Sequence, residues 1–368
     1  MKIALDKVPR MTPPEPKKPE ALGRRDLLRS IAAVCLATAC GPPAGAKTAA
    51  AAAGTKLAPF YGGHVELYSW FDLPEDPRSR ELSGIAWDEA TRTLWAVQDE
   101  TANIVPIIPD QAFQRWSFGP VITLKMGFPL DLEGIVITSS GFVVASEAGP
   151  RVLEVDRKGN LRRDIPLPAP FSKARDNKSL ESLTMSPDGK HLFTTTEAAL
   201  TPDGGKATPA EGTRLRILRM TLAGGESAEH AYATDPAPHP SGDYGVADLA
   251  ALSGEDLLVL ERGWTHGSGN TSRIYQVSLA DSTTSCLLTP ELAPDGPVMA
   301  KKLIVDLAKL PVKGLPPSKQ QQDSPLLDNF EGLAVGPRLP DGRASLILVS
   351  DDNGRSDQFA RIVVLAVG

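Results

Sequence analysis

The sequence repeats one two-strand pattern five times, and this repeat limits the fold more than any other feature. In each copy a short apolar strand opens on an acidic or hydroxyl residue, and a second strand ends on a carboxylate. Hairpins that recur at intervals of roughly 50 to 80 residues are typical of a β-propeller, where each blade buries its faces against its neighbours. The copies span Ser83 to Asp99, Glu133 to Glu147, Glu181 to Glu197, Asp248 to Glu261 and Glu331 to Asp351.

We therefore predict that residues 61–368 form an all-β propeller, with five blades as the main interpretation. The last repeat is one strand short, because only Arg361 to Val367 follows it. The segment His64 to Leu73 can supply the missing strand and close the ring within the last blade. Six blades is the alternative, if the long insertion in blade four hides a degenerate unit. In blade one we expect the fourth strand at Val121 to Lys125.

Residues 1–40 have the order of an export signal. The pair Arg24-Arg25 precedes a short apolar segment, Ser30 to Ala39, and the pattern resembles a twin-arginine signal. The apolar segment is too short to span a bilayer, which needs about 20 residues. Residues 41–60, rich in Gly, Pro and Ala, predict a flexible linker.

The cleavage chemistry of this signal is open. Cys40 directly follows small residues and suggests a lipid anchor, but Leu36 lies four residues before it, where a lipobox has its leucine at three. Lipidation at Cys40 and ordinary cleavage are both consistent with the sequence. We expect an extracytoplasmic protein that is periplasmic, anchored to the bacterial envelope only through this lipid, or secreted.

The body of the chain is acidic. Residues 1–40 hold eight Lys/Arg and four Asp/Glu, so the net charge of −6 leaves −10 on residues 41–368. This balance argues against nucleic acid and anionic membrane surfaces as partners and favours cations. Cys286 is the one cysteine outside the leader, so no intramolecular disulfide is expected. We expect a monomer.

The residue types favour a hard metal ion over a nucleophilic catalyst. The sequence has no Gly-x-Ser-x-Gly, His-Glu-x-x-His, Walker or Cys-x-x-Cys motif, and its five histidines are scattered. Calcium takes six to eight oxygen ligands, which the repeated carboxylates can supply. The strand-ending set also includes Asp99, Glu147 and Glu197, and Ser83 replaces the first opening carboxylate. The candidate calcium ligands are Glu133, Glu181, Asp248, Glu261, Glu331 and Asp351.

Basic residues lie next to these carboxylates. Lys178 comes three residues before Glu181, and Arg262 directly follows Glu261. Interleaved carboxylates and cations can bind a metal ion and an anionic ester together. We therefore name Glu181, Glu331, Lys178 and Arg262 as catalytic candidates. The alternative is that these groups are ion pairs and strand caps that hold the blades in register.

Three segments resemble a known family. Asn177 to Leu183 is similar to its N-[KR]-G-x-E-G-[LI] segment, with Ser182 in place of the second glycine. Asp248 to Trp264, DLAALSGEDLLVLERGW, is similar to its LLVLER stretch, and DNFEGLA at Asp328 to Ala334 with the later LVSDDN and QF is similar to its ending. Together they resemble the phytase-like, "esterase-like" β-propeller group of exported bacterial proteins, over roughly Ser83 to Val367.

The resemblance implies a function that remains an expectation. It implies a propeller that hydrolyses a small anionic ester, a phosphate ester or another ester, with Ca²⁺ in the central channel. Fold alone does not fix the chemistry. Two other functions stay open: a non-catalytic, calcium-stabilised propeller that binds a protein or glycan, and a lactonase or sugar-ester hydrolase.

Overall fold

The computed structural model describes residues 63–368 apart from residues 226 and 288. The predicted export signal at 1–40, Cys40 and the predicted linker at 41–60 lie outside the described residues. Short 3₁₀ turns occur in the loops at Ala169–Lys173, Thr201–Asp203, Ser282–Thr284 and Leu307–Lys309. Among the described residues, no helix has the length and apolar character needed to cross a membrane.

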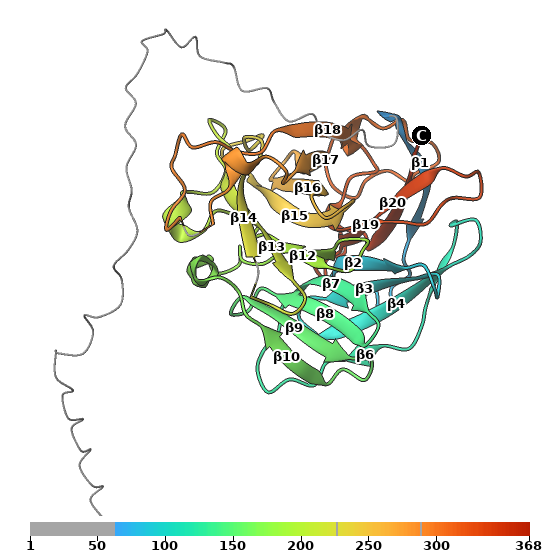
Figure 1. Ribbon diagram of the computed structural model, residues 1–368. Helices are drawn as coiled ribbons and strands as arrows, with labels where there is room; N and C mark the ends of the chain where they lie inside the picture. Colours follow the sequence, from blue (N-terminus) through green and yellow to red (C-terminus); the bar gives the residue numbers. More distant parts are fainter. Residues whose placement is uncertain (1–62, 226, 288) are drawn as a thin grey trace, which may run out of the picture. The chain divides into compact units, whose positions relative to one another are not determined.

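The described strands form five antiparallel sheets, which confirms the prediction of an all-β, five-bladed propeller (Figure 1). Each sheet except the last follows the chain from its inner to its outer strand. Blade one holds β2(Leu82–Asp88), β3(Thr93–Gln98), β4(Asn103–Pro109), β5(Trp116–Phe118) and β6(Ile122–Thr123); blade two holds β7(Leu132–Thr138), β8(Gly141–Ser146), β9(Arg151–Asp156) and β10(Leu161–Ile165); blade three holds β11(Thr184–Met185), β12(His191–Thr194), β13(Arg214–Thr221) and β14(Ser227–Ala233); blade four holds β15(Asp243–Ala251), β16(Asp256–Thr265), β17(Gly269–Ser278) and β18(Lys301–Asp306); blade five holds β19(Asn329–Val335), β20(Ala344–Asp351), β21(Arg361–Val367) and β1(Val65–Asp72).

The five inner strands surround a central channel. β2 contacts β7 and β19, β15 contacts β19, and β11 contacts both β7 and β15. Groups at the same level of these strands therefore meet around one axis. In Figure 1 the labels β2, β7, β15 and β19 lie near the middle of the ribbon.

Side-chain alternation assigns each strand face to a different blade interface. In β20, Leu346 and Leu348 pack in the cluster shared with blade four, whereas Ile347 and Val349 pack in the cluster shared with blade one. Successive side chains of a strand point to opposite faces, so a strand covered on both faces is apolar throughout. Similar clusters fill the other three interfaces. The core is therefore divided into five layers between blades.

The ring closes as predicted, with the first described strand in the last blade. β1 pairs antiparallel with β21, for example Leu67 opposite Leu365. Arg361 on β21 is fully buried, and its Nε donates to Oδ1 of Asp72 on β1 over 2.5 Å. The same guanidinium donates to the carbonyl of Pro325 over 2.7 Å. This buried ion pair fixes the closing strand to the ring.

The fourth strand of blade one differs from the prediction. The segment expected at Val121 to Lys125 contributes only β6, while β5 lies earlier in the sequence. Both strands pair with β4, and Gly119-Pro120 separates them. Because proline cannot donate a backbone hydrogen bond, it interrupts the ladder at this point.

The glycine that follows the opening residue has a packing role. A Cβ atom on Gly84 would lie 2.3 Å from the carbonyl oxygen of Glu133 in the next blade, and one on Gly134 would lie 2.5 Å from the backbone nitrogen of Leu183. Inner strands approach too closely here for a side chain. The Glu-Gly and Ser-Gly pairs therefore mark the contact points of neighbouring blades.

Candidate functional site

Carboxylates gather in a cavity of about 620 Å³ at the start of the inner strands. Arg262 is the one basic residue among the described residues that line it, and the lining includes no Ser, Cys or His. The carboxylates are Asp99, Glu100, Asp131, Glu133, Glu147, Glu181, Glu197, Glu331 and Asp351. The structure thus brings together four of the six predicted metal ligands, together with three of the four catalytic candidates.

β-Bulges explain how the opening carboxylates reach the cavity. The pairing of β7 with β8 shifts between Leu132 and Gly134, so Glu133 is the extra residue of the strand. The pairing of β19 with β20 shifts in the same way around Glu331. A bulge re-aims one side chain and is common next to functional sites. The second carboxylate of the blade comes from the neighbouring strand. Ser146 pairs with Leu132, and Glu147, the residue after Ser146, supplies it.

Blade four departs from the predicted pattern by one residue. Val246 pairs with Glu261, and Asp248 pairs with Leu260, so the bulge falls at Ala247. The equivalents of Glu133 and Glu147 are therefore Ala247 and Arg262, not Asp248 and Glu261. A shift of one residue moves a side chain to the opposite face of a strand. Blade four consequently contributes a cation where the other blades contribute a carboxylate.

Asp248 lies outside the cavity and connects two blades. Its side chain is buried and accepts hydrogen bonds from the backbone N–H groups of Leu249 (2.8 Å) and Leu333 (2.7 Å). Leu333 belongs to the inner strand of blade five. Burial raises the pKa of Asp248 well above its ordinary value, although the two backbone donors oppose this shift. Asp248, predicted as a metal ligand, therefore connects the inner strands of blades four and five.

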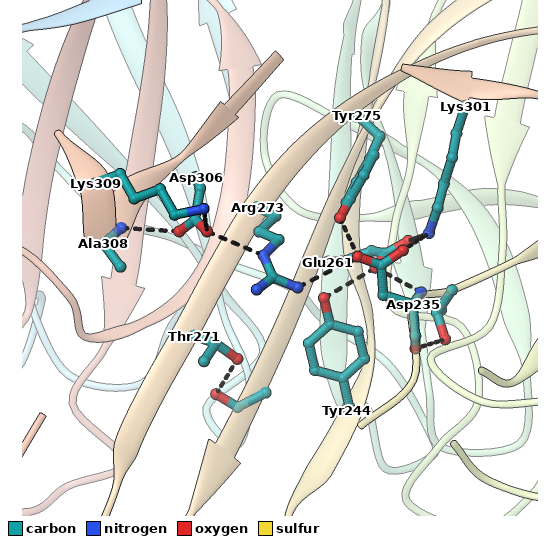
Figure 2. Close-up of polar contacts among 12 residues, drawn as sticks. Asp235, Tyr244, Glu261, Thr271, Arg273, Tyr275, Lys301, Asp306, Ala308 and Lys309 are labelled. Carbon is teal, nitrogen blue, oxygen red and sulfur yellow. Dashed lines mark hydrogen bonds and ion pairs between the residues drawn. The ribbon is translucent and has the colours of Figure 1, made fainter. Parts of the chain in front are cut away.

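Glu261 also lies outside the cavity, in a polar cluster shared by blades three and four (Figure 2). Its fully buried carboxylate accepts hydrogen bonds from the hydroxyls of Tyr232 and Tyr244 and from the backbone N–H of Asp235 (3.0 Å). Lys301 Nζ lies 2.6 Å from Glu261 Oε1 and 2.7 Å from Asp235. These partners occupy both carboxylate oxygens, so Glu261 stabilises the blade interface.

One part of the cavity has the geometry of a cation site. Carboxylate oxygens of Asp99, Asp131 and Glu133 lie within 4.8 Å of one another. Oδ1 of Asp131 is buried without a hydrogen-bond partner among the described residues. The sequence reasoning missed Asp131, although it stands two residues before Glu133. Its position next to an opening carboxylate was the available signal.

Burial and mutual repulsion raise the pKa of several cavity carboxyl groups. Burial, together with the hydrogen bond and the charge of Asp131, raises the pKa of Asp99 to about 9. Burial and the negative charge of Glu331 raise the pKa of Glu133 well above its ordinary value. Burial and Glu133 do the same for Glu181. Such a cluster favours a cation that would compensate its charge.

Arg262 connects blades three, four and five at the wall of the cavity. Its Nη1 donates to Oδ1 of Asn329 over 2.8 Å, and its Nη2 lies 3.2 Å from Glu331 Oε1 and 3.9 Å from Glu197 Oε1. Burial disfavours its charge, but Glu331 and Glu197 outweigh burial and raise the pKa of Arg262 above its ordinary value. Its Nε is buried and has no partner among the described residues.

Lys178 forms ion pairs with two carboxylates beside the cavity. It is not among the residues that line the cavity. Its Nζ lies 2.6 Å from Glu197 and 2.6 Å from Asp243. Burial opposes its charge, yet Glu197 and Asp243 raise the pKa of Lys178 above its ordinary value. In this arrangement Lys178 neutralises Glu197 and positions it, instead of receiving a substrate directly.

A comparison with protein families matches most of the propeller. The model of the phytase-like family, described as "Esterase-like activity of phytase", covers residues 77–354. The chain belongs to this family. The match includes every carboxylate that lines the cavity, so the phytase-like region and the site coincide.

Individual relatives of this phytase-like chain are distant. A protein of Arthroderma benhamiae named "Uncharacterized secreted protein" is 27% identical over 228 residues, which is 48% of this chain and 44% of that protein. The chain therefore spans less than half the length of this curated relative.

Two solved structures show how low the structural and sequence similarity to other proteins is. A PQQ-bound aldose sugar dehydrogenase from Streptomyces coelicolor is 13% identical with a TM-score of 0.39, covering 84% of this chain and 100% of that one. The periplasmic gluconolactonase PpgL of Pseudomonas aeruginosa is 14% identical with a TM-score of 0.34, covering 77% and 85%. These similarities are too low to transfer any activity to the phytase-like chain.

Proposed function

We propose that the acidic cavity binds Ca²⁺ and hydrolyses a small anionic ester, with a phosphate monoester as the principal substrate. The observation that carries the proposal is the convergence of nine carboxylates and one guanidinium on one cavity. Oxygen ligands of this kind suit a hard cation, and the guanidinium suits an anionic group. Membership of the phytase-like family supports ester hydrolysis.

The residues of the cavity fit calcium. Asp99, Asp131 and Glu133 offer oxygens close enough to share one ion, and the unpartnered Oδ1 of Asp131 is a ready ligand. Glu147 and Asp351 provide further oxygens in the same cavity. Bound calcium would polarise the ester and neutralise the negative charge that builds up during its hydrolysis.

The side chains of the cavity supply binding and proton transfer. Because the described lining has no hydroxyl, thiol or imidazole nucleophile, we assign the attack to water. Arg262 orients the anionic ester. Burial raises the pKa of Glu331 above its ordinary value, although Arg262 and Asn329 oppose this shift, and in its ionised form Glu331 accepts a proton from that water. Glu181, whose pKa is raised by burial, gives a proton to the departing alcohol as its bond to phosphorus breaks.

Export is part of the same proposal. The twin-arginine pattern at Arg24-Arg25 and the secreted relative from Arthroderma benhamiae support an extracytoplasmic protein. Free calcium is plentiful outside cells, where extracellular modules work with affinities of about 10⁻⁴ to 10⁻³ M.

Hydrolysis assays with and without metal test the proposal. Purified protein is incubated with p-nitrophenyl phosphate, p-nitrophenyl acetate and a lactone, in Ca²⁺ or in excess chelator. We expect phosphate release that requires Ca²⁺. A calcium-dependent rise in melting temperature without turnover of any ester would support the non-catalytic propeller instead, and turnover of the lactone alone would support a lactonase.

The proposal also predicts how stability depends on pH. Groups with a raised pKa, such as Asp99 at about 9, bind more protons in the folded state than in the unfolded state, where ordinary values near 4 apply. Their stabilising contribution is complete below pH 4 and is lost as the pH rises towards 9.

We therefore expect the melting temperature in chelator to fall by several degrees between pH 5 and pH 8. Saturating Ca²⁺ should remove most of this slope, because it compensates the ionised carboxylates. Differential scanning calorimetry at matched ionic strength measures both curves. A flat or rising curve in chelator contradicts the assignment of the raised pKa values.

A further inference from the structure

A second cavity, of about 320 Å³, adjoins the acidic one. The two share Arg262, Glu331 and Asn353 as lining residues. A molecule whose anionic end lies at Arg262 can therefore extend into this side cavity. The side cavity also has a different composition, because most of its remaining lining residues are uncharged.

An exposed tryptophan and side-chain amides characterise this side cavity. Trp264 on β16 is 38% exposed, which is unusual for so large an apolar side chain. Its Nε1 donates to Oε1 of Gln320 over 3.1 Å, and this hydrogen bond favours one orientation of the indole ring. Gln358 and Asn353 add further amides, joined by a hydrogen bond of 3.0 Å.

These groups suit a neutral ring that carries hydroxyl groups. An indole face packs against the apolar C–H face of such a ring, while amides both donate to and accept from hydroxyl groups. Pockets with one aromatic wall and a few converging polar groups are typical of small-molecule sites.

The charges argue against a substrate that carries many phosphates. Arg355 is bound through two hydrogen bonds of 2.8 Å to Asp357. Arg262 is already paired with Glu331 at 3.2 Å and donates to Asn329, and its Nε is buried without a partner among the described residues. Asp243 and Glu331 are the carboxylates in the lining. A polyphosphorylated ring would need more free cations than these residues offer.

We propose that the side cavity holds the alcohol part of the substrate, and that this part is a sugar ring with free hydroxyl groups. The substrate class is then a sugar monophosphate, with its phosphate in the acidic cavity and its ring on Trp264. This inference rests on the proposed function, since the phosphate site is the one assigned above.

Kinetics with two phosphate monoesters test the inference. Replacing Trp264 with alanine should raise KM for glucose 1-phosphate by about tenfold, because a buried indole contact is a typical hot spot of binding. KM for ethyl phosphate, which has no ring, should change by less than about twofold, and kcat for both should be kept. Trp264→Phe should retain most of the affinity, and Leu303→Ala, at an exposed site on β18, serves as the folding control.

Calorimetric binding separates this inference from the proposed function. If no ester is hydrolysed, glucose 1-phosphate should still bind more tightly than inorganic phosphate in Ca²⁺, and Trp264→Ala should abolish the difference. Equal affinity for the two, or equal losses for glucose 1-phosphate and ethyl phosphate in Trp264→Ala, overturns the inference. A tenfold Trp264 effect on AMP or inositol hexaphosphate, with none on glucose 1-phosphate, overturns it as well.

Discussion

Replacing Asp131 with asparagine is expected to weaken calcium binding by about 100-fold or more and to lower hydrolysis to the level seen in chelator. The carboxylate of Asp131 lies within 4.8 Å of those of Asp99 and Glu133, and its Oδ1 has no partner among the described residues. An amide keeps one oxygen but removes the charge, which hard cations need from their ligands. Isothermal titration calorimetry with Ca²⁺ measures the affinity directly.

Asp248→Asn provides a matched control for this variant. It makes the same chemical change at a buried aspartate whose oxygens accept from Leu249 and Leu333. We expect this variant to be less stable, because the amide offers one acceptor oxygen to two backbone donors, but to bind Ca²⁺ within about twofold of the unaltered protein. Unchanged affinity in Asp131→Asn, or equal losses in both variants, would remove Asp131 from the site.

Removal of Arg262 should give the second large effect, a loss of about 3 to 5 kcal/mol of unfolding free energy in chelator, as expected when one partner of a buried ion pair is deleted. The guanidinium lies 3.2 Å from Glu331 and 3.9 Å from Glu197, and both side chains of the Arg262–Glu331 pair are mostly buried. Arg262→Ala leaves these carboxylates without their compensating charge. Urea unfolding at pH 7 measures the difference.

Calcium should restore much of the stability of Arg262→Ala, since it supplies positive charge to the same cavity, but it should not restore ester hydrolysis. Arg361→Ala is the matched control, because Arg361 is also buried and paired, with Asp72, but lies at the ring closure. Arg361→Ala should be less stable than the unaltered protein, and calcium should stabilise both by the same amount. The assignment fails if Arg262→Ala in chelator is as stable as the unaltered protein.

The fold followed from the sequence because its signals are local and repeated. Three signals depend on short-range patterns: the alternating apolar strands, the Glu-Gly and Ser-Gly pairs, and the missing strand in the last repeat. Gly84, Gly134 and Gly332 show why: in three of the five repeats the close approach of inner strands leaves no room for a side chain at the same place. The closing strand was predictable because one blade was visibly incomplete.

The site was predicted less well because bulges are not visible in an apolar pattern. Alignment of Asp248 with Glu133 looked natural, but the extra residue of β15 is Ala247, which turns Asp248 and Glu261 away from the cavity. The adjacent Arg262 was named for its charge and not for its register. Asp131 was missed because it lies before the repeat as the pattern defined it, although its contacts depend on a neighbouring blade.

Ring closure by β1 has a consequence for the order of events during biosynthesis. Blade five needs both β1 and β21, whose paired residues, such as Leu67 and Leu365, are almost 300 residues apart in the sequence. Contacts of such long range form slowly, and a chain still emerging from the ribosome lacks them. Glu331 and Asp351 come from this last blade, so the acidic cavity is complete only once blade five has folded. Calcium bound by the complete cavity would therefore stabilise only those chains in which β1 and β21 have already paired.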